Sequence, residues 1–183
     1  MPPAIEFLHV GGEQAAQHLD ELMALYADVY AEPPYSWGRE HVELFAERFH
    51  GQRSQDGFTL VEARDRGQLV GMGFGVTLQR NTPWWQGLTV PLGQDVTAEH
   101  PNRTFALVEL LVRAPWRRQH VAASIHRRLL ADRIEERATL TVLPAAEAAH
   151  AAYRAWGWQK VAQKRNPLPG SPLFDVMLKP LVF

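Results

Sequence analysis

A glutamate inside an apolar run and a tyrosine in an alanine-rich segment are the side chains best suited to proton transfer. Glu109 interrupts the run Ala106–Val112, a pattern that predicts a central strand covered on both faces. Burial raises the pKa of a carboxyl group, so Glu109 is a candidate general base, although a structural glutamate paired with an arginine is an equal alternative. Tyr153 lies in a helix expected over Glu147–Ala155. Its hydroxyl can donate a proton, but spacing alone favours a packing role.

A basic loop follows this strand and precedes an expected helix. Residues 113–120 are polar and contain three arginines, and apolar spacing predicts a helix from Val121 to about Glu136. Such a loop directs backbone N–H groups and the positive end of a helix toward one point, which suits a pyrophosphate. The small side chains of Ala122 and Ala123 allow a phosphate to approach the backbone. Ordinary surface arginines on a solvated helix face are the alternative.

Several other chemistries have no support in the residues. The chain has no cysteine, which excludes disulfides, thiolate metal sites and cysteinyl intermediates. His120 and His126 are separated by about 240° around a helix, so they cannot share a metal ion. No serine stands in a Gly-x-Ser-x-Gly elbow. We therefore expect no metal site and no serine hydrolase.

The composition is that of a globular protein with a nearly neutral charge. The 183 residues are 46% hydrophobic and 21% charged, which favours a single domain over residues 1–183. The 19 Lys and Arg residues balance 20 Asp and Glu residues, so no global field attracts nucleic acid or an anionic membrane. A nucleic-acid-binding helix built on Arg117, Arg118, Arg127 and Arg128 is therefore disfavoured. With no leader-like or membrane-spanning run, we expect a cytoplasmic protein, a monomer or a homodimer.

The first half of the chain predicts helices followed by a hairpin. A strand is expected over Ile5–Val10, and a helix with apolar residues from Leu19 to Tyr30. A second helix is expected to be capped by Ser36 and stopped by Gly51. A hairpin follows over residues 58–79, with its turn at residues 64–67, and residues 81–103 are expected to form a long loop.

Three alternating glycines stand in the second strand of that hairpin. Gly71, Gly73 and Gly75 leave one face of the strand almost bare. The string also suggests a dinucleotide-binding loop, but such a loop lies between a strand and a helix, whereas strand residues continue here on both sides. The structural interpretation is favoured. Further strands are expected over residues 138–143, 158–163 and 173–178.

Residues 106–163 resemble the GNAT superfamily of N-acetyltransferases in the order of their motifs. The signature loop of that family is Arg or Gln, two residues, Gly, one residue, then Gly or Ala, and this chain has RRQHVA over residues 117–122. His120 replaces the glycine, and histidine tolerates positive φ better than most side chains. VELLV followed by Pro115 and Trp116 resembles the family's fourth strand and bulge. LTVLP and AAEAAHAAYRAWGW are similar to its second motif, with Tyr153 and Gly157 in place, although an asparagine often found early in that motif is absent.

The resemblance implies an α+β fold, a single GNAT-like domain with a mixed, mostly antiparallel sheet that splays in a V after its fourth strand. It implies acetyl-CoA as cofactor, and direct attack of an amine on the thioester in a ternary complex, with Glu109 assisting deprotonation and Tyr153 protonating the thiolate. The cofactor-binding residues that it implies are Leu111, Val112, Arg117, Arg118, Gln119, His120, Val121, Ala122 and Ala123.

Aromatic residues in two segments are candidates for binding the acceptor. In the resembled fold these segments flank the acceptor cleft, and they contain Tyr30, Tyr35, Trp37, Trp84 and Trp85. Such rings bind amines by stacking or cation–π contact, although tryptophans in loops also anchor loops by burial. We expect a small-molecule primary amine with an apolar or aromatic body. The alternatives are a peptide or protein N-acetyltransferase and a non-catalytic acyl-CoA sensor.

Overall fold

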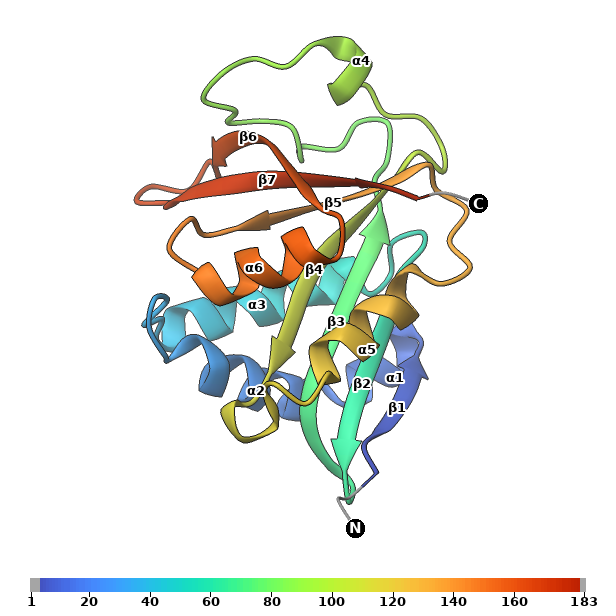
Figure 1. Ribbon diagram of the computed structural model, residues 1–183, viewed down its shortest axis with the longest axis vertical. Coiled ribbons are helices and arrows are strands. Elements are labelled where there is room, and N and C mark those ends of the chain that lie inside the picture. The colour runs from blue at the N-terminus through green and yellow to red at the C-terminus, as the bar shows by residue number, and fades with distance from the viewer. Residues whose placement is uncertain (1–3, 182–183) are drawn as a thin grey trace. The chain divides into compact units, whose positions relative to one another are not determined.

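The computed structural model describes residues 4–181, in which strands and helices are interspersed along the chain (Figure 1). The strands are β1 (Glu6–Val10), β2 (Thr59–Asp65), β3 (Gln68–Thr77), β4 (Thr104–Val112), β5 (Arg137–Val142), β6 (Gln159–Arg165) and β7 (Leu173–Pro180). The helices are α1 (Gly12–Gln17), α2 (Leu19–Tyr30), α3 (Arg39–Gln52), α4 (Gln94–Thr97), the 3₁₀ helix η1 (Ala114–Trp116), α5 (Val121–Leu130) and α6 (Glu147–Ala155). The predicted α+β class is confirmed.

The seven strands form one mixed sheet in the order β1-β2-β3-β4-β5-β7-β6. Pairing is antiparallel between β1 and β2, β2 and β3, β5 and β7, and β6 and β7. β4 and β5 are parallel, and their pairing covers Thr104–Ala106 with Arg137–Thr139, whereas β4 continues to Val112. β4 therefore continues from Leu107 to Val112 beyond the residues that pair with β5.

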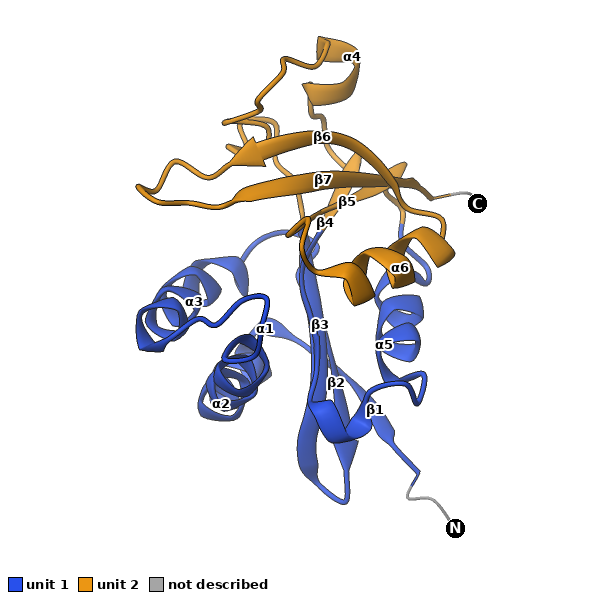
Figure 2. Ribbon diagram, turned by 60° about the vertical axis from the view of Figure 1, so that its left-hand side comes forward, with its two compact units in different colours: residues 1–76, 107–133 blue, residues 77–106, 134–183 orange. Residues whose placement is uncertain are grey.

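The chain divides into two compact units (Figure 2). Unit 1 comprises residues 1–76 and 107–133, and unit 2 comprises residues 77–106 and 134–183. In unit 1, α2 and α3 lie on one face of the strands and α5 lies on the other. The core on the α2–α3 side is rich in large rings, including Tyr26, Phe45 and Phe74, each at most 1% exposed.

The alternating glycines of β3 make room for α5. A Cβ atom added at Gly73 would lie 2.7 Å from Ile125 Cγ2 and 2.8 Å from Leu129 Cδ1, closer than van der Waals contact permits. A Cβ atom added at Gly71 would likewise lie 3.3 Å from Ile125 Cδ1. The structural interpretation of this glycine string is confirmed.

Unit 2 contains the antiparallel strands β5, β7 and β6, with α6 and the long loop. His150 of α6 lies 3.2 Å from Asp175 of β7, which also pairs with Lys160 of β6. The long loop is bound to β6 through a bridge between Leu88 and Lys164. It also contains the short helix α4, which the sequence did not predict.

Three expected boundaries were wrong. Helix α5 ends at Leu130 and not near Glu136, because Ala131 is extended and Asp132 has a φ of 57°. Ser36 does not cap α3, since Gly38 is the N-cap residue and Ser36 has a φ of 50°. Gly51 lies within α3, which continues to Gln52.

Candidate active site

Strand β4 and helix α2 bring Glu109 and Tyr30 together in unit 1. The Tyr30 hydroxyl donates a hydrogen bond of 2.6 Å to Glu109 Oε2, although the residues are 79 positions apart. On β4, Val108 and Leu111 both pack against the α2–α3 core, which departs from the strict alternation of a regular strand. This irregularity surrounds Glu109, at the position where the sequence predicts a bulge.

The electrostatics of Glu109 are those of a carboxyl group poised near neutrality. Burial raises its pKa from 4.5 to about 7, and the hydrogen bond from Tyr30 and the charge of Arg48 oppose that rise. Burial likewise raises the pKa of Tyr30 well above its ordinary value, and the Glu109 charge adds to the effect. The phenol therefore stays protonated as a donor while the carboxyl group changes its charge near pH 7.

Aromatic rings surround this pair. Tyr30 stacks on Trp37 at 4.7 Å between ring centroids, and Tyr35 meets both rings edge-on at 4.7 and 5.3 Å. Trp37 also stacks on His41 at 4.7 Å with an interplanar angle of 4°. Tyr26, one helical turn before Tyr30, lies 4.4 Å from it. The structure thus gathers the three aromatic residues predicted in this segment beside Glu109.

The loop before α5 has the backbone conformation expected of an amide cradle. His120, at the N-cap of α5, has a φ of 59° and a ψ of 16°, and Arg118 has a φ of 58°. Within residues 4–181 no side chain caps α5 by a hydrogen bond, so the first N–H groups of this helix lack a side-chain partner. Val121 is buried, whereas Ala122 and Ala123 are half-buried. The residues present fit a pyrophosphate.

Arg117 connects this loop to two other parts of unit 1. Its Nε donates to the Val112 carbonyl oxygen at 2.9 Å, and its Nη1 lies 2.7 Å from Glu32 Oε2. Gln119 Nε2 donates to the Pro115 carbonyl oxygen at 2.9 Å. Arg117 is therefore engaged by the protein itself, and its side chain holds the loop against the end of β4.

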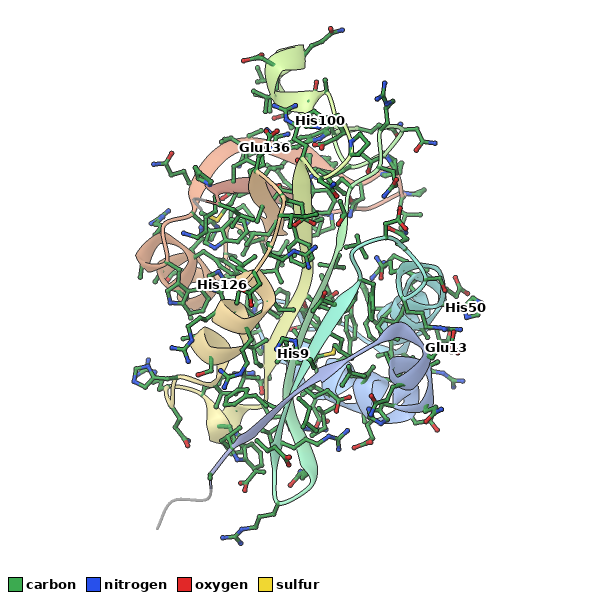
Figure 3. All side chains as sticks on the ribbon, turned by 90° about the vertical axis from the view of Figure 1, so that its right-hand side faces the viewer. His9, Glu13, His50, His100, His126 and Glu136 are labelled. Carbon is green, nitrogen blue, oxygen red and sulfur yellow. The ribbon has the colours of Figure 1, made fainter. Side chains whose placement is uncertain are left out.

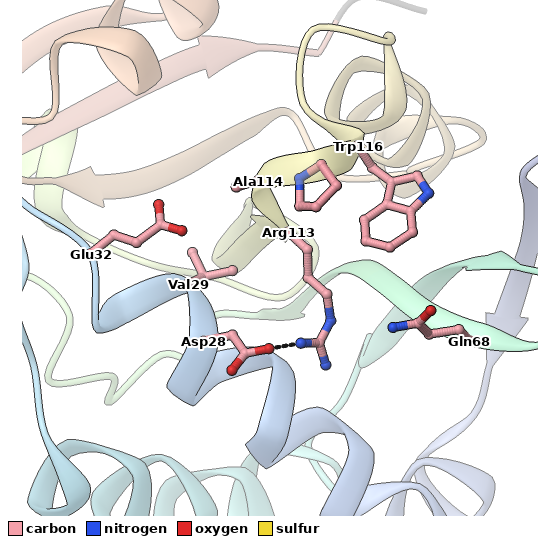
Figure 4. Close-up of a pocket in the computed structure, with 8 residues that line it drawn as sticks. Asp28, Val29, Glu32, Gln68, Arg113, Ala114 and Trp116 are labelled. Atoms are coloured by element: carbon pink, nitrogen blue, oxygen red, sulfur yellow. Dashed lines mark ion pairs between the residues drawn. The ribbon is translucent and has the colours of Figure 1, made fainter.

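A cavity of about 430 Å³ lies beside this loop in unit 1 (Figure 4). Arg113 forms an ion pair with Asp28 in its wall, as the dashed line in Figure 4 marks. The indole of Trp116 faces the same cavity and donates to Asp65 Oδ2 at 2.9 Å. Arg113 thus differs from Arg117: its side chain lines this cavity, whereas that of Arg117 bridges the Val112 carbonyl oxygen and Glu32.

Tyr153 is carried by helix α6 in unit 2. It is half-buried, and its ring meets Trp156 at 5.8 Å and Trp158 at 6.0 Å, both edge-on. These contacts fix the ring from one side through packing. They are compatible with the packing role and with the proton-donating role that the sequence leaves open.

The two loop tryptophans are held within unit 2. Trp85 is 9% exposed, and its indole Nε1 donates to Glu99 Oε1 at 3.0 Å. The Lys164 ammonium lies 5.1 Å from the centre of the Trp84 ring and donates to the Trp84 carbonyl oxygen. These are contacts of residues that anchor a loop by burial, and an acceptor-binding role for Trp84 and Trp85 stays a prediction.

Histidines and carboxylates do not gather into a metal site within residues 4–181. In unit 1, His126 of α5 and His50 of α3 lie on opposite sides of the strands (Figure 3). In unit 2, His100 pairs with Glu136 at 3.3 Å. Across the same part of the chain, no helix is long and apolar enough to cross a bilayer.

A model of the acetyltransferase (GNAT) family matches residues 22–158. The chain belongs to this family. The predicted family, its fold and its acetyltransferase class are thereby confirmed, and the GNAT match spans β4, the loop before α5, and α6. Among curated proteins, no sequence matches the chain.

Solved GNAT structures share the fold at low sequence identity. The ribosomal-protein-S18-alanine N-acetyltransferase from Escherichia coli is 14% identical, with a TM-score of 0.65 over 98% of this chain and 96% of that chain. The paia N-acetyltransferase from Thermoplasma acidophilum, solved with coenzyme A, is 13% identical, with a TM-score of 0.60 over 97% and 99%. An aminoglycoside 6'-acetyltransferase type Ii is 16% identical, with a TM-score of 0.66 over 97% and 98%. Two of these names state an acceptor, a ribosomal-protein alanine in one and an aminoglycoside in the other, and these acceptors differ.

Two residues near Glu109 and Tyr30 were not predicted from the sequence. The charge of Arg48 on α3 acts on Glu109, and His41 extends the aromatic stack. Both lie on α3, and no motif marks them. The sequence contains a local indication only for the neighbouring aromatic cluster, because Tyr26 and Tyr30 are four residues apart and so share one face of a helix.

Proposed function

We propose that this GNAT protein transfers an acetyl group from acetyl-CoA to the primary amine of a small molecule, by direct attack in a ternary complex. The observation that carries the proposal is the half-buried Glu109, which accepts a hydrogen bond from Tyr30, whose ring in turn contacts Tyr35 and Trp37. A carboxylate beside aromatic rings suits a cationic amine, which both kinds of group attract. The whole chain, residues 1–183, is proposed to act as one transferase domain.

The segment from Leu111 to Ala123 is proposed to hold the cofactor. Backbone N–H groups at the start of α5 meet the pyrophosphate, and Ala122 and Ala123 leave room for it. The positive φ of His120 supports this role, because it turns the chain into the helix without a capping side chain. When bound, acetyl-CoA supplies a thioester carbonyl that an amine can attack.

Glu109 is proposed to take the proton that the acceptor must lose. A lysine-like amine has a pKa of about 10.4, so at pH 7 only about one molecule in 2,500 is neutral. A carboxylate whose pKa lies at about 7 accepts a proton from such an ammonium at neutral pH more readily than an ordinary glutamate. The hydroxyl of Tyr153 is proposed to protonate the departing thiolate, a role supported by the sequence motif around it.

An acetyl-CoA-dependent screen tests the proposed activity. Small aliphatic amines, small aromatic amines and peptides with free N-termini are incubated with the protein, and free CoA thiol is measured. We expect thiol release with small amines, and little release with Glu109→Gln. Release with peptides alone would transfer the proposal to a peptide acceptor, and binding of acetyl-CoA with no release on any acceptor would identify a sensor.

Calorimetric titration with CoA tests the cofactor segment separately. Arg117→Ala is expected to weaken binding, because Arg117 Nε holds the Val112 carbonyl at the base of the loop. Arg113→Ala is the matched control, since Arg113 pairs with Asp28 and donates to the Leu69 carbonyl oxygen. Equal affinities for the wild type and both variants would contradict the proposal that this loop binds the cofactor.

A further inference from the structure

The phenol of Tyr30 does more than contribute to an aromatic wall. We propose that Tyr30 is a positioning residue for Glu109: its hydroxyl holds one carboxylate oxygen and favours the ionised, proton-accepting form of the side chain. The catalytic meaning of this role rests on the function proposed above for Glu109. The pairing itself does not, because it is a property of the folded chain. Tyr30, predicted as an acceptor-binding residue, thus acts on the acceptor through Glu109.

The geometry of the contact is that of a strong, directed hydrogen bond. The Tyr30 oxygen lies 2.6 Å from Glu109 Oε2, within the range of hydrogen bonds from a hydroxyl to a charged carboxylate. Tyr30 is the partner that donates in this pair, and a carboxylate accepts more strongly than a neutral carboxyl group. The contact therefore stabilises the charged form of Glu109 relative to the protonated form.

The ring that carries this hydroxyl is held on several sides. Trp37 stacks on it, Tyr35 meets it edge-on, and Tyr26 lies against it from the preceding turn of α2. Trp37 is in turn stacked on His41 of α3. A ring packed in this way loses little freedom when its hydroxyl engages Glu109, so the donor is preorganised.

The other titratable groups that act on Glu109 do so from α2, the α2–α3 loop and α3. Tyr26 and Tyr35 interact with its charge, and each has a pKa raised by burial, so both are neutral near pH 7. Arg48 also favours the ionised carboxylate, but less than Tyr30 does, and Arg48 is an exposed residue of α3. The Tyr30 hydrogen bond is thus the largest influence opposing burial at this carboxyl group.

Tyr30→Phe tests the inference, because it removes one oxygen and leaves the ring stack. The titration of the Glu109 carboxyl carbon is followed by ¹³C NMR, and Glu109→Gln identifies the signal. The midpoint should rise by roughly one pH unit, about a tenfold change in proton affinity, the size of a charge-assisted hydrogen bond. Tyr35→Phe is the matched control and should move the midpoint much less. An unchanged or lower midpoint in Tyr30→Phe would overturn the inference.

A second variant covers the case in which Tyr30→Phe does not fold. Replacement of Tyr30 by 3-fluorotyrosine keeps the hydroxyl and makes it a stronger donor, so the midpoint of Glu109 should fall. A rise or no change would contradict the pairing. The two substitutions therefore predict opposite shifts from one contact, which a general loss of packing would not produce.

The pH dependence of acetyl transfer distinguishes this inference from the proposed function. If the wild type transfers acetyl groups, the acidic limb of the Tyr30→Phe profile should shift to higher pH. A limb at the wild-type position would overturn the positioning role. If the wild type shows no acetyl transfer and the NMR midpoint still moves as predicted, the pairing stands and the proposed function fails.

Discussion

Two acidic residues of this protein, the half-buried Glu109 and the buried Glu99, each accept a hydrogen bond from an aromatic side chain, but their other partners differ. Glu109 in unit 1 accepts from the phenol of Tyr30 at 2.6 Å. Glu99 in unit 2 accepts from the indole of Trp85 at 3.0 Å, and also from Thr104 and Arg137 at 2.9 and 3.0 Å. Arg137 additionally lies over the Trp85 ring.

The difference shows what separates a structural glutamate from a candidate base. The guanidinium of Arg137 matches the charge of Glu99 and ties β5 to the long loop. Among residues 4–181, Glu109 has one hydrogen-bond partner, a neutral phenol, and burial raises its pKa to about 7. Glu99 thus has a cation beside it that balances its charge and ties the structure together, whereas Glu109, with a pKa of about 7, can exchange a proton near neutral pH.

The largest expected effect is on turnover, when Glu109 is changed. Glu109→Gln keeps the shape of the side chain and removes its basicity, so kcat/KM near pH 7 should fall by roughly 10²- to 10⁴-fold. This loss of rate should become smaller as the pH approaches the pKa of the amine, because more of the acceptor is then neutral without a base. Steady-state kinetics across pH measure it, and thermal unfolding serves as the control for folding. A variant as active as the wild type would make Glu109 structural, like Glu99.

Glu99 should show the opposite pattern. Glu99→Ala leaves the Arg137 guanidinium without its carboxylate and the Trp85 N–H without its acceptor. Removing one partner of a buried pair costs about 3 to 5 kcal/mol, or a melting temperature lower by roughly 6 to 20 °C in a chain of this size. The melting curve is the measurement. Loss of activity at an unchanged melting temperature would erase the contrast between the two glutamates.

Tyr153 extends the comparison to a hydroxyl in unit 2. Tyr153→Phe keeps the edge-on contacts of the ring with Trp156 and Trp158 and removes only the proton donor. We expect CoA affinity to be retained and the rate to fall roughly 10- to 1,000-fold. Calorimetry and single-turnover kinetics give the two values. A normal rate would assign Tyr153 to packing.

Substitutions of His120 should have the smallest effect, which arises from the left-handed backbone conformation of this residue. At a φ of 59°, glycine is unstrained and a β-branched residue is not, so His120→Gly should be tolerated and His120→Val should cost about 1 to 2 kcal/mol. Melting temperatures and CoA affinities of the two variants are compared. If both variants melt and bind alike, the left-handed conformation is not important for the loop.

Local patterns in the sequence predicted most helices and strands, but they could not predict contacts between residues far apart in the chain. The helix Glu147–Ala155 was predicted to the residue, because alanine content and a following glycine mark both its formation and its end. The end of α5 at Leu130 was missed, since the next residues continue a helical pattern and only the fold turns Asp132 into a left-handed conformation.

The candidate site was predicted unevenly for the same reason. Glu109 stood out as one acid in an apolar strand, and the resemblance to GNAT proteins placed the loop over residues 117–122. The contact of Glu109 with Tyr30 joins residues 79 positions apart, and no periodicity reports such a pair. Likewise, Trp85 anchors the long loop by donating a hydrogen bond to Glu99, 14 residues later, and no local sequence pattern predicts this pair.

The pH dependence of kcat/KM for acetyl transfer, in the wild type and in Glu109→Gln, tests the role of Glu109 most directly. In the wild type, the rate should rise with pH through an acidic limb with a midpoint at about 7, the pKa that burial gives this carboxyl group. Below that midpoint the carboxyl group is protonated and cannot accept the proton of the amine. In Glu109→Gln the limb should disappear, and the rate should follow the ionisation of the amine alone. The same limb in both proteins would contradict the assignment of Glu109 as the base.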